Sequence, residues 1–94
     1  MPNIRIPTPL RKLTNGKEEV AATGATIGAL IANLETQYPG IKARLVQGDG
    51  MRPGLAVVID SQVSREGLTA SVAENSEVHF IPSVSGGSEF AMAG

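Results

Sequence analysis

The stretch Thr26-Ile27-Gly28-Ala29-Leu30-Ile31-Ala32-Asn33-Leu34-Glu35-Thr36-Gln37-Tyr38 decides the fold of this 94-residue chain. Its large apolar residues recur every three or four positions, at 27, 30, 31, 34 and 38, which is the spacing of one stripe along an α-helix. Thr26 has a suitable side chain for an N-cap, and Pro39-Gly40 ends the helix because proline disfavours helical geometry in the preceding residue. A helix with one apolar stripe needs a second layer to cover that stripe.

Strand-like segments before the helix supply part of that layer. Residues 3–6 alternate polar and apolar side chains, the period of a half-buried strand. Pro7 and Pro9 stop a regular ladder, and Asn15-Gly16 is a dipeptide that favours a hairpin turn. Residues 17–22 are therefore expected to run back as the second strand of an opening β-hairpin.

The segments after the helix complete the layer. Residues 41–46 are expected to form a short second helix, and the glycine-rich residues 47–54 a flexible loop. The apolar run 55–59 reads as a buried central strand. After the turn Asp60-Ser61, a small strand follows at 62–64 and a final strand at 77–81. The order predicts an α+β fold, with the helix across a mixed sheet and the first and last strands side by side.

Composition narrows the class of protein. A length of 94 residues fits one domain, and 3% aromatic residues imply an aliphatic core. A net charge of -1 without a basic run argues against nucleic acid as the main partner, and no apolar run approaches the length of a membrane span. The absence of cysteine removes disulfides and thiolate metal sites and fits a cytoplasmic location. We expect no metal site.

The end of the last apolar run has a different character. The segment Ile81-Pro82-Ser83-Val84-Ser85-Gly86-Gly87 leads from the final strand to two adjacent glycines, which have no side chain to bury. Such a segment can be a linker, or a backbone that passes through a narrow slot in another protein. We divide the chain into a folded domain (residues 1–82), a C-terminal arm (83–87) and an extension (88–94).

Together these segments resemble the ubiquitin-like β-grasp sulfur carriers, the family of the molybdopterin synthase small subunit and the thiamine sulfur carrier. The likeness rests on the opening hairpin, the helix from Thr26, the strand ending Val58-Ile59-Asp60 and the Gly-Gly finish. Ile6-Pro7-Thr8, Leu34-Glu35-Thr36-Gln37-Tyr38-Pro39-Gly40-Ile41 and the arm are most similar to the mycobacterial branch that serves cysteine biosynthesis. The resemblance covers residues 1–87 and implies a β-grasp fold of four to five strands and one main helix.

The resemblance also implies a function. An E1-like adenylating enzyme would use ATP to activate the C-terminal carboxylate of Gly87, and a sulfur donor would convert it to a thiocarboxylate. A sulfur-accepting biosynthetic enzyme would then receive the sulfur. The residues expected to thread into partners are Pro82, Ser83, Val84, Ser85 and Gly86. The chain would bind no cofactor and would be a carrier, not an enzyme; the alternative is a ubiquitin-like modifier that is conjugated to lysines through Gly87.

The chain departs from the family at its end, because Ser88-Glu89-Phe90-Ala91-Met92-Ala93-Gly94 follows the glycines. With this extension present, the carboxyl group of Gly87 is held in a peptide bond and cannot be adenylated. Two explanations stay open. The chain is a precursor that a JAMM-type zinc metalloprotease cuts between Gly87 and Ser88, or the extension derives from cloning.

Other candidate residues have plainer interpretations. His79, the single histidine, is expected to be a partly exposed strand residue and not a titrating group. Whichever of Phe80 and Ile81 faces the helix should belong to the core, while Val84 is the better candidate for partner contact. The basic residues are expected to be scattered surface charge, not a steering patch; they include Arg11, Lys12, Arg44, Arg52 and Arg65. The sequence does not indicate the pathway that receives the sulfur.

Overall fold

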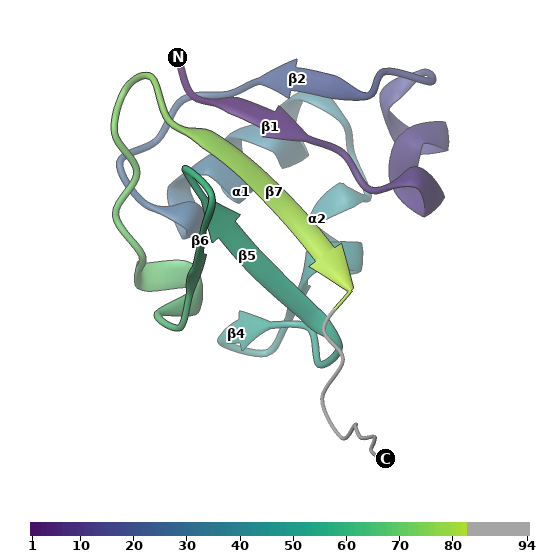
Figure 1. Ribbon diagram of the computed structural model, residues 1–94. Helices are drawn as coiled ribbons and strands as arrows, with labels where there is room; N and C mark the ends of the chain where they lie inside the picture. The colour runs from purple at the N-terminus through teal and green to yellow at the C-terminus, as the bar shows by residue number, and fades with distance from the viewer. Residues whose placement is uncertain (83–94) are drawn as a thin grey trace.

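The structure is a computed structural model that describes residues 1–82. The main sheet has five strands. It faces the viewer in Figure 1, and helix α1 crosses behind it. The expected α+β pair of layers is therefore confirmed. The elements are β1 (Asn3–Arg5), η1 (Thr8–Thr14), β2 (Glu19–Ala21), α1 (Ile27–Gln37), α2 (Ile41–Leu45), β3 (Val46–Gln47), β4 (Gly50–Met51), β5 (Leu55–Ile59), β6 (Gln62–Ser64), η2 (Gly67–Thr69) and β7 (Glu77–Pro82).

The strand order of the main sheet is β2-β1-β7-β5-β6. The first and last strands lie side by side, as predicted, and they are parallel, with Asn3 opposite Glu77. The other neighbours in this sheet pair antiparallel. The last strand is thus inserted at the centre of the sheet, with a neighbour on each side.

Helix α1 begins and ends where the sequence predicts. The Ala29 N–H donates to the Thr26 hydroxyl oxygen at 3.1 Å, which satisfies one of the free donors of the first turn. At the other end, the Tyr38 N–H donates to the Leu34 carbonyl at 2.7 Å. The predicted stripe is buried against the sheet, apart from the half-buried Tyr38. Each fully buried side chain of this size contributes about 1.5–3 kcal/mol.

The chain enters α1 through a glycine that no other residue replaces easily. Gly24 has a φ of +155°, and a Cβ atom built there would lie 2.6 Å from the Leu30 backbone nitrogen. Real Cβ atoms essentially never lie this close to backbone, so a side chain at this position would displace the start of the helix.

The opening hairpin exists, but its turn is not the predicted one. β1 and β2 pair antiparallel, yet η1 lies between them, because Pro7 and Pro9 stop the ladder and proline suits the first turn of a helix. Asn15 adopts a left-handed φ of 58° at the end of η1, and the Gly16 N–H donates to the Arg11 carbonyl at 2.7 Å. The Asn15-Gly16 pair therefore ends a 3-10 helix instead of joining two strands.

The predicted loop at residues 47–54 is also partly wrong. β3 and β4 form a two-stranded hairpin within it, with Gln47 opposite Gly50. Gly48 supplies the positive φ, 64°, that a two-residue turn of this kind requires. The predicted second helix is confirmed as α2.

β5 is one position from the edge of the sheet, between β7 and β6. Only Val57 in this strand is fully buried, and the other four residues are partly exposed. The prediction of a strand was correct, but the strand has one buried face, not two. The two-residue connection to β6 is the predicted turn, with Asp60 at a φ of 50° and Ser61 at 72°.

The core lies between the sheet and the two α-helices and is aliphatic apart from Phe80. Phe80 is 3% exposed, so it is the residue of the pair 80–81 that belongs to the core. Within residues 1–82, no helix is long and apolar enough to cross a membrane. The buried apolar residues are Ile4, Ile6, Leu10, Val20, Ala22, Ile27, Leu30, Ile31, Leu34, Ile41, Leu45, Val57, Ala70, Val72, Val78 and Phe80.

Candidate functional site

The candidate site is built around the end of β7, from which the arm leaves. Pro82, assigned from sequence to the arm as well as to the domain, is the last residue of β7 and lies opposite Leu55. The rest of the arm and the expected cleavage point lie outside the described residues, so their roles stay predictions. These residues are Ser83, Val84, Ser85, Gly86, Gly87 and Ser88.

Side chains along β7 alternate between the core and the outer face of the sheet. Val78 and Phe80 are buried against the helix layer. His79 is half-buried on the opposite face, and Ile81 on that face is 38% exposed. His79 is therefore the partly exposed strand residue that the sequence predicts, and Ile81 presents apolar surface immediately before Pro82.

Apolar side chains predominate on the outer face over β7, β5 and β6. The register places Ile81 beside Ala56 and His79 beside Val58, and it continues from Val58 to Val63. These residues share one face because side chains alternate along each strand. Val63 is 64% exposed and Ile81 is 38% exposed. We call Ala56, Val58, Val63 and Ile81 the apolar strip.

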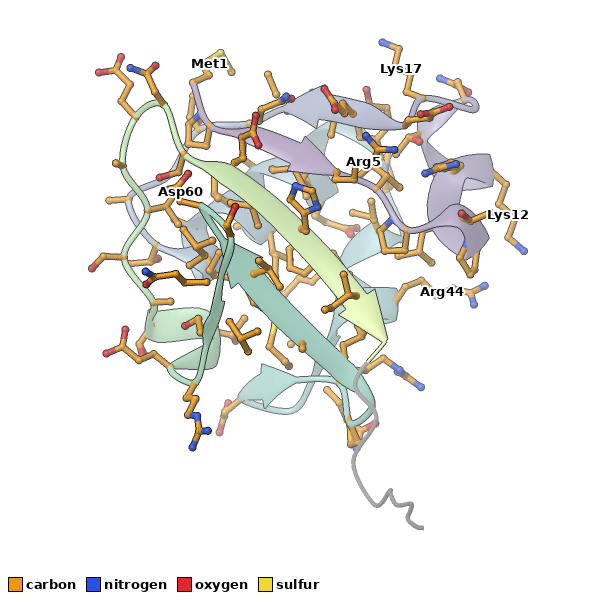
Figure 2. All side chains as sticks on the ribbon, in the orientation of Figure 1. Met1, Arg5, Lys12, Lys17, Arg44 and Asp60 are labelled. Carbon is orange, nitrogen blue, oxygen red and sulfur yellow. The ribbon has the colours of Figure 1, made fainter. Side chains whose placement is uncertain are left out.

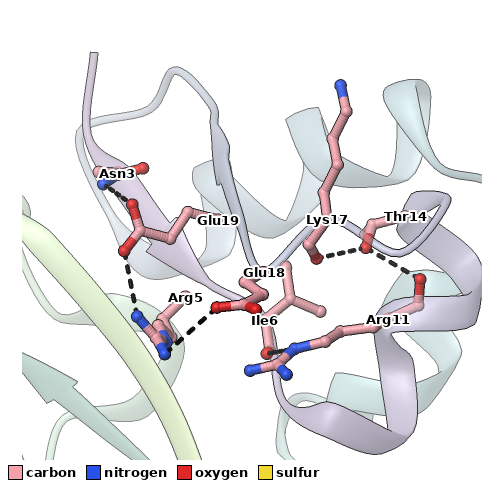
Figure 3. Close-up of polar contacts among 8 residues, drawn as sticks. All are labelled: Asn3, Arg5, Ile6, Arg11, Thr14, Lys17, Glu18 and Glu19. Atoms are coloured by element: carbon pink, nitrogen blue, oxygen red, sulfur yellow. Dashed lines mark hydrogen bonds and ion pairs between the residues drawn. The ribbon is translucent and has the colours of Figure 1, made fainter.

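The outer face is charged over β1 and β2. Arg5 Nη1 lies 3.2 Å from a Glu19 carboxylate oxygen, and Arg5 Nη2 lies 3.6 Å from Glu18 (Figure 3). The Asn3 amide donates to the other Glu19 oxygen at 2.9 Å. The Asn3 hydrogen bond, with Arg5 beside it, lowers the pKa of the Glu19 carboxyl from its ordinary value. The polar groups of this half satisfy one another.

A carboxylate anchors the start of β7 at the other end of the sheet, where Asp60 is labelled in Figure 2. One Asp60 oxygen accepts from the Glu77 N–H at 2.9 Å, and the other accepts from the Ser76 hydroxyl at 2.8 Å. These two bonds, the Glu77 bond first, lower the pKa of Asp60 from its ordinary value. The β5–β6 turn thereby holds the entry into β7.

The basic residues named from the sequence do not form one patch. Arg11 Nε donates to the Ile6 carbonyl at 3.1 Å, and Arg52 Nη1 donates to the Ala43 carbonyl at 3.1 Å. Lys12 is exposed on η1, which also carries Arg11, and Arg44 is exposed on α2, as Figure 2 shows. Arg65 follows β6 and lines a shallow hollow together with Asp60 and Glu66.

Sequence reasoning missed most of the apolar strip. Its signal was present in Gln62-Val63-Ser64, where one valine lies between two polar residues of a short strand. An isolated valine of this kind is ordinary on a protein surface. It gains meaning only from the register, which sets it beside Val58 and leads on toward Ile81.

The described part of the chain contains no group of three or more His, Asp or Glu residues that could hold a metal ion. The described residues offer an apolar surface on the outer face of the sheet, which reaches Ile81 near the end of the central strand.

The comparisons with known proteins agree with this geometry. A model of the ThiS family matches residues 4–87. The chain belongs to the ThiS family. It is 38% identical to the sulfur carrier protein CysO of Mycobacterium tuberculosis and of Mycobacterium bovis, over 89% of this chain and 96% of those proteins.

Solved structures place this ThiS-family chain in the β-grasp fold. The crystal structure of the Amycolatopsis orientalis BexX/CysO complex contains a chain that is 35% identical, with a TM-score of 0.85, covering 93% of this chain and 100% of that one. M. tuberculosis CysO gives 31% identity and a TM-score of 0.83 over 89% of this chain and all of the other. The small archaeal modifier protein 1 of Methanosarcina acetivorans, at 23% identity and a TM-score of 0.73 over 92% and 95% of the two chains, shares the fold.

Proposed function

We propose that this chain is a sulfur carrier whose reactive group is the carboxylate of Gly87, freed by removal of residues 88–94. One observation carries the proposal. The family match ends at Gly87, the second of the two glycines, in a chain whose curated relatives are named sulfur carrier proteins. The family and the position of the glycines thus point to the same residue.

The proposed chemistry takes place on partner enzymes. An E1-like adenylating enzyme transfers AMP from ATP to the Gly87 carboxylate and releases pyrophosphate. A sulfur donor attacks the activated carbonyl carbon, AMP leaves, and a thiocarboxylate remains. A glycine favours this step because it has no side chain to hinder the nucleophile. The carrier supplies no catalytic side chain, and a biosynthetic enzyme accepts the sulfur.

The domain contributes recognition at a distance from the reaction. The apolar strip supports this role, because it leads along the outer face to Ile81 and lies outside the core. Apolar side chains gathered on an exposed sheet face are typical of surfaces that associate with other proteins. A relative also assembles with a partner protein, as in the BexX/CysO complex.

Intact-mass spectrometry tests the proposal. A form ending at Gly87 is incubated with ATP, sulfide and the E1-like adenylating enzyme of the same genome. We expect a mass gain that equals the exchange of one oxygen for one sulfur. A form ending at Gly86 and the 94-residue chain are matched controls that should not react. If the Gly87 form stays unchanged while a known carrier reacts with its own enzyme, the proposal is wrong.

The same proposal assigns the extension a role as a pro-segment, which a JAMM-type zinc metalloprotease removes. The C-terminal mass of the protein purified from its native cell should end at Gly87, and a zinc chelator should preserve residues 88–94 in a lysate. Gly87→Ala should slow removal and activation without changing the melting temperature. If immunoblots instead show larger adducts that depend on Gly87, the modifier alternative gains support.

A further inference from the structure

The ladder between β1 and β7 stops at a defined position. The Asn3 N–H donates to the Ser76 carbonyl at 3.0 Å. In a parallel strand, the backbone N–H and C=O groups of every second residue point toward the same neighbouring strand. The backbone groups of Asn3 and Arg5 therefore point toward β7, and the next residue to do so would be Pro7. Proline has no N–H, so the ladder lacks the donor that would reach the Phe80 carbonyl. Beyond Arg5, this edge of β7 has no partner strand among the described residues.

A groove of about 490 Å³ lies where β1 has turned away from β7. Its walls come from three parts of the chain that are distant in sequence: the segment around η1, the start of β5 and the end of β7. The walls are mostly apolar and contain no carboxylate. They consist of Arg5, Ile6, Pro7, Thr8, Pro9, Arg11, Gly54, Leu55, His79, Phe80 and Ile81.

The two arginines of this groove differ. Arg5 lies beside Glu18 and Glu19, so its charge is largely compensated. Arg11 is half-buried, and its Nε is held by the Ile6 carbonyl at 3.1 Å, as Figure 3 shows. Among residues 1–82, no carboxylate lies within ion-pair distance of Arg11. The two Nη atoms of this positioned guanidinium make no hydrogen bond to residues 1–82, and such a group suits a carboxylate from another molecule.

We propose that this groove is the docking site for an extended segment of the adenylating enzyme, with a carboxylate side chain that pairs with Arg11 and an apolar side chain against Leu55 and the exposed Ile81. The backbone of the segment supplies the N–H that Pro7 lacks, in the manner of strand addition. Charge complementarity favours an acidic segment, because the walls of the groove include two arginines and no carboxylate. This inference rests on the proposed function. It adds a second contact between the carrier and the adenylating enzyme, beside the apolar strip.

Binding of the Gly87-ending form to the adenylating enzyme of the same genome tests the groove. Arg11→Glu should raise the dissociation constant by about tenfold or more, because it sets like charges against each other in a partly desolvated site. Lys12→Glu is the matched control. It makes the same change of charge one residue away, on an exposed position of η1 that does not line the groove, and should change binding less than about twofold.

Two further variants separate charge from structure. Arg11→Ala removes the hydrogen bond to Ile6 without adding a negative charge, and Arg11→Lys keeps the charge but not the planar fork. We expect the loss of affinity to be largest for Arg11→Glu, smaller for Arg11→Ala and smallest for Arg11→Lys. The salt dependence of the association rate should flatten in Arg11→Glu. Amide NMR spectra of each variant check that η1 is intact.

The outcomes separate this inference from the function. If the wild-type form is thiolated but Arg11→Glu and Lys12→Glu bind equally well, the groove is not the docking site while the carrier function stands. If Arg11→Ala and Arg11→Glu lose the same affinity, Arg11 acts only through its hydrogen bond to Ile6. The proposal of an acidic partner segment is then wrong. If the wild-type form neither binds nor reacts, both proposals fall.

Discussion

The two faces of β7 differ in what they contact. The inner face carries Val78 and Phe80, which are 0% and 3% exposed and pack in the core. The outer face carries His79, which is half-buried, and Ile81, which is 38% exposed. One strand of six residues thus packs in the core on one side and presents apolar surface on the other. Substitutions on the two faces should separate unfolding free energy from partner binding.

The largest expected effect comes from the helix that covers the inner face. Leu30 is 0% exposed in α1, so Leu30→Ala leaves a cavity and should lower the free energy of unfolding by about 2–5 kcal/mol. Urea denaturation followed by circular dichroism measures this loss. A change below about 1 kcal/mol would mean that the helix and the inner face are not closely packed.

A substitution at Gly24, just before the same helix, tests how closely the backbone approaches the first turn of α1. Gly24→Ala places a Cβ atom against the Leu30 nitrogen at a φ of +155°, and the strain should cost about 1–3 kcal/mol. Gly16→Ala is a comparison at another positive φ, +83°, where nothing lies within 4 Å of the added atom. The urea midpoint should fall further for Gly24→Ala, and equal losses would contradict the close approach.

A smaller and pH-dependent effect is expected at the start of β7. Because its hydrogen bonds lower the pKa of Asp60 below the ordinary 3.8, the folded state binds this proton less readily than the unfolded chain does. The resulting stabilisation is fully present above pH 3.8 and is lost as the pH falls through the lowered pKa.

Asp60→Asn should therefore reduce the melting temperature at pH 7 and flatten its fall below pH 4. Part of the acid sensitivity should remain, since the pKa values of Glu19 and Glu35 are also lowered. Melting temperatures of both proteins from pH 7 to pH 2 measure this difference. Parallel curves would show that Asp60 does not anchor β7.

The smallest effect on stability is expected on the outer face. Val63 is 64% exposed, so Val63→Ser should change the free energy of unfolding by no more than about 0.5 kcal/mol. It should weaken partner binding, because it interrupts the apolar strip. Thr36→Ala is a control on the exposed side of α1, far from the strip. Unchanged binding in Val63→Ser would remove the strip from the proposed interface.

Much of the fold could be predicted because its signals are local. The apolar stripe and N-cap Thr26 define α1, and the short apolar runs define β5 and β7. The errors arose where local chemistry has two outcomes. Asn15-Gly16 suits a hairpin turn and equally the end of a 3-10 helix, and only the packing of Leu10 and Thr14 against the core favours the second.

The candidate site was harder to predict because it depends on contacts between distant segments. The glycines of the arm are visible in the sequence, but the apolar strip needs the register between β5, β6 and β7. Predicting the groove requires the order of the strands as well, because only that order brings Arg11, Leu55 and Phe80 together. Arg11 resembles any other surface arginine until its bond to Ile6 is known.

The central place of β7 has a mechanical consequence. A partner that grips the chain beyond Pro82 and pulls along the strand loads the ladders to β1 and β5 at the same time. The antiparallel bonds to β5 lie across the direction of pull, so the strand must shear past both neighbours together and cannot unzip one bond after another. The domain is therefore built to resist force applied through its own C-terminus.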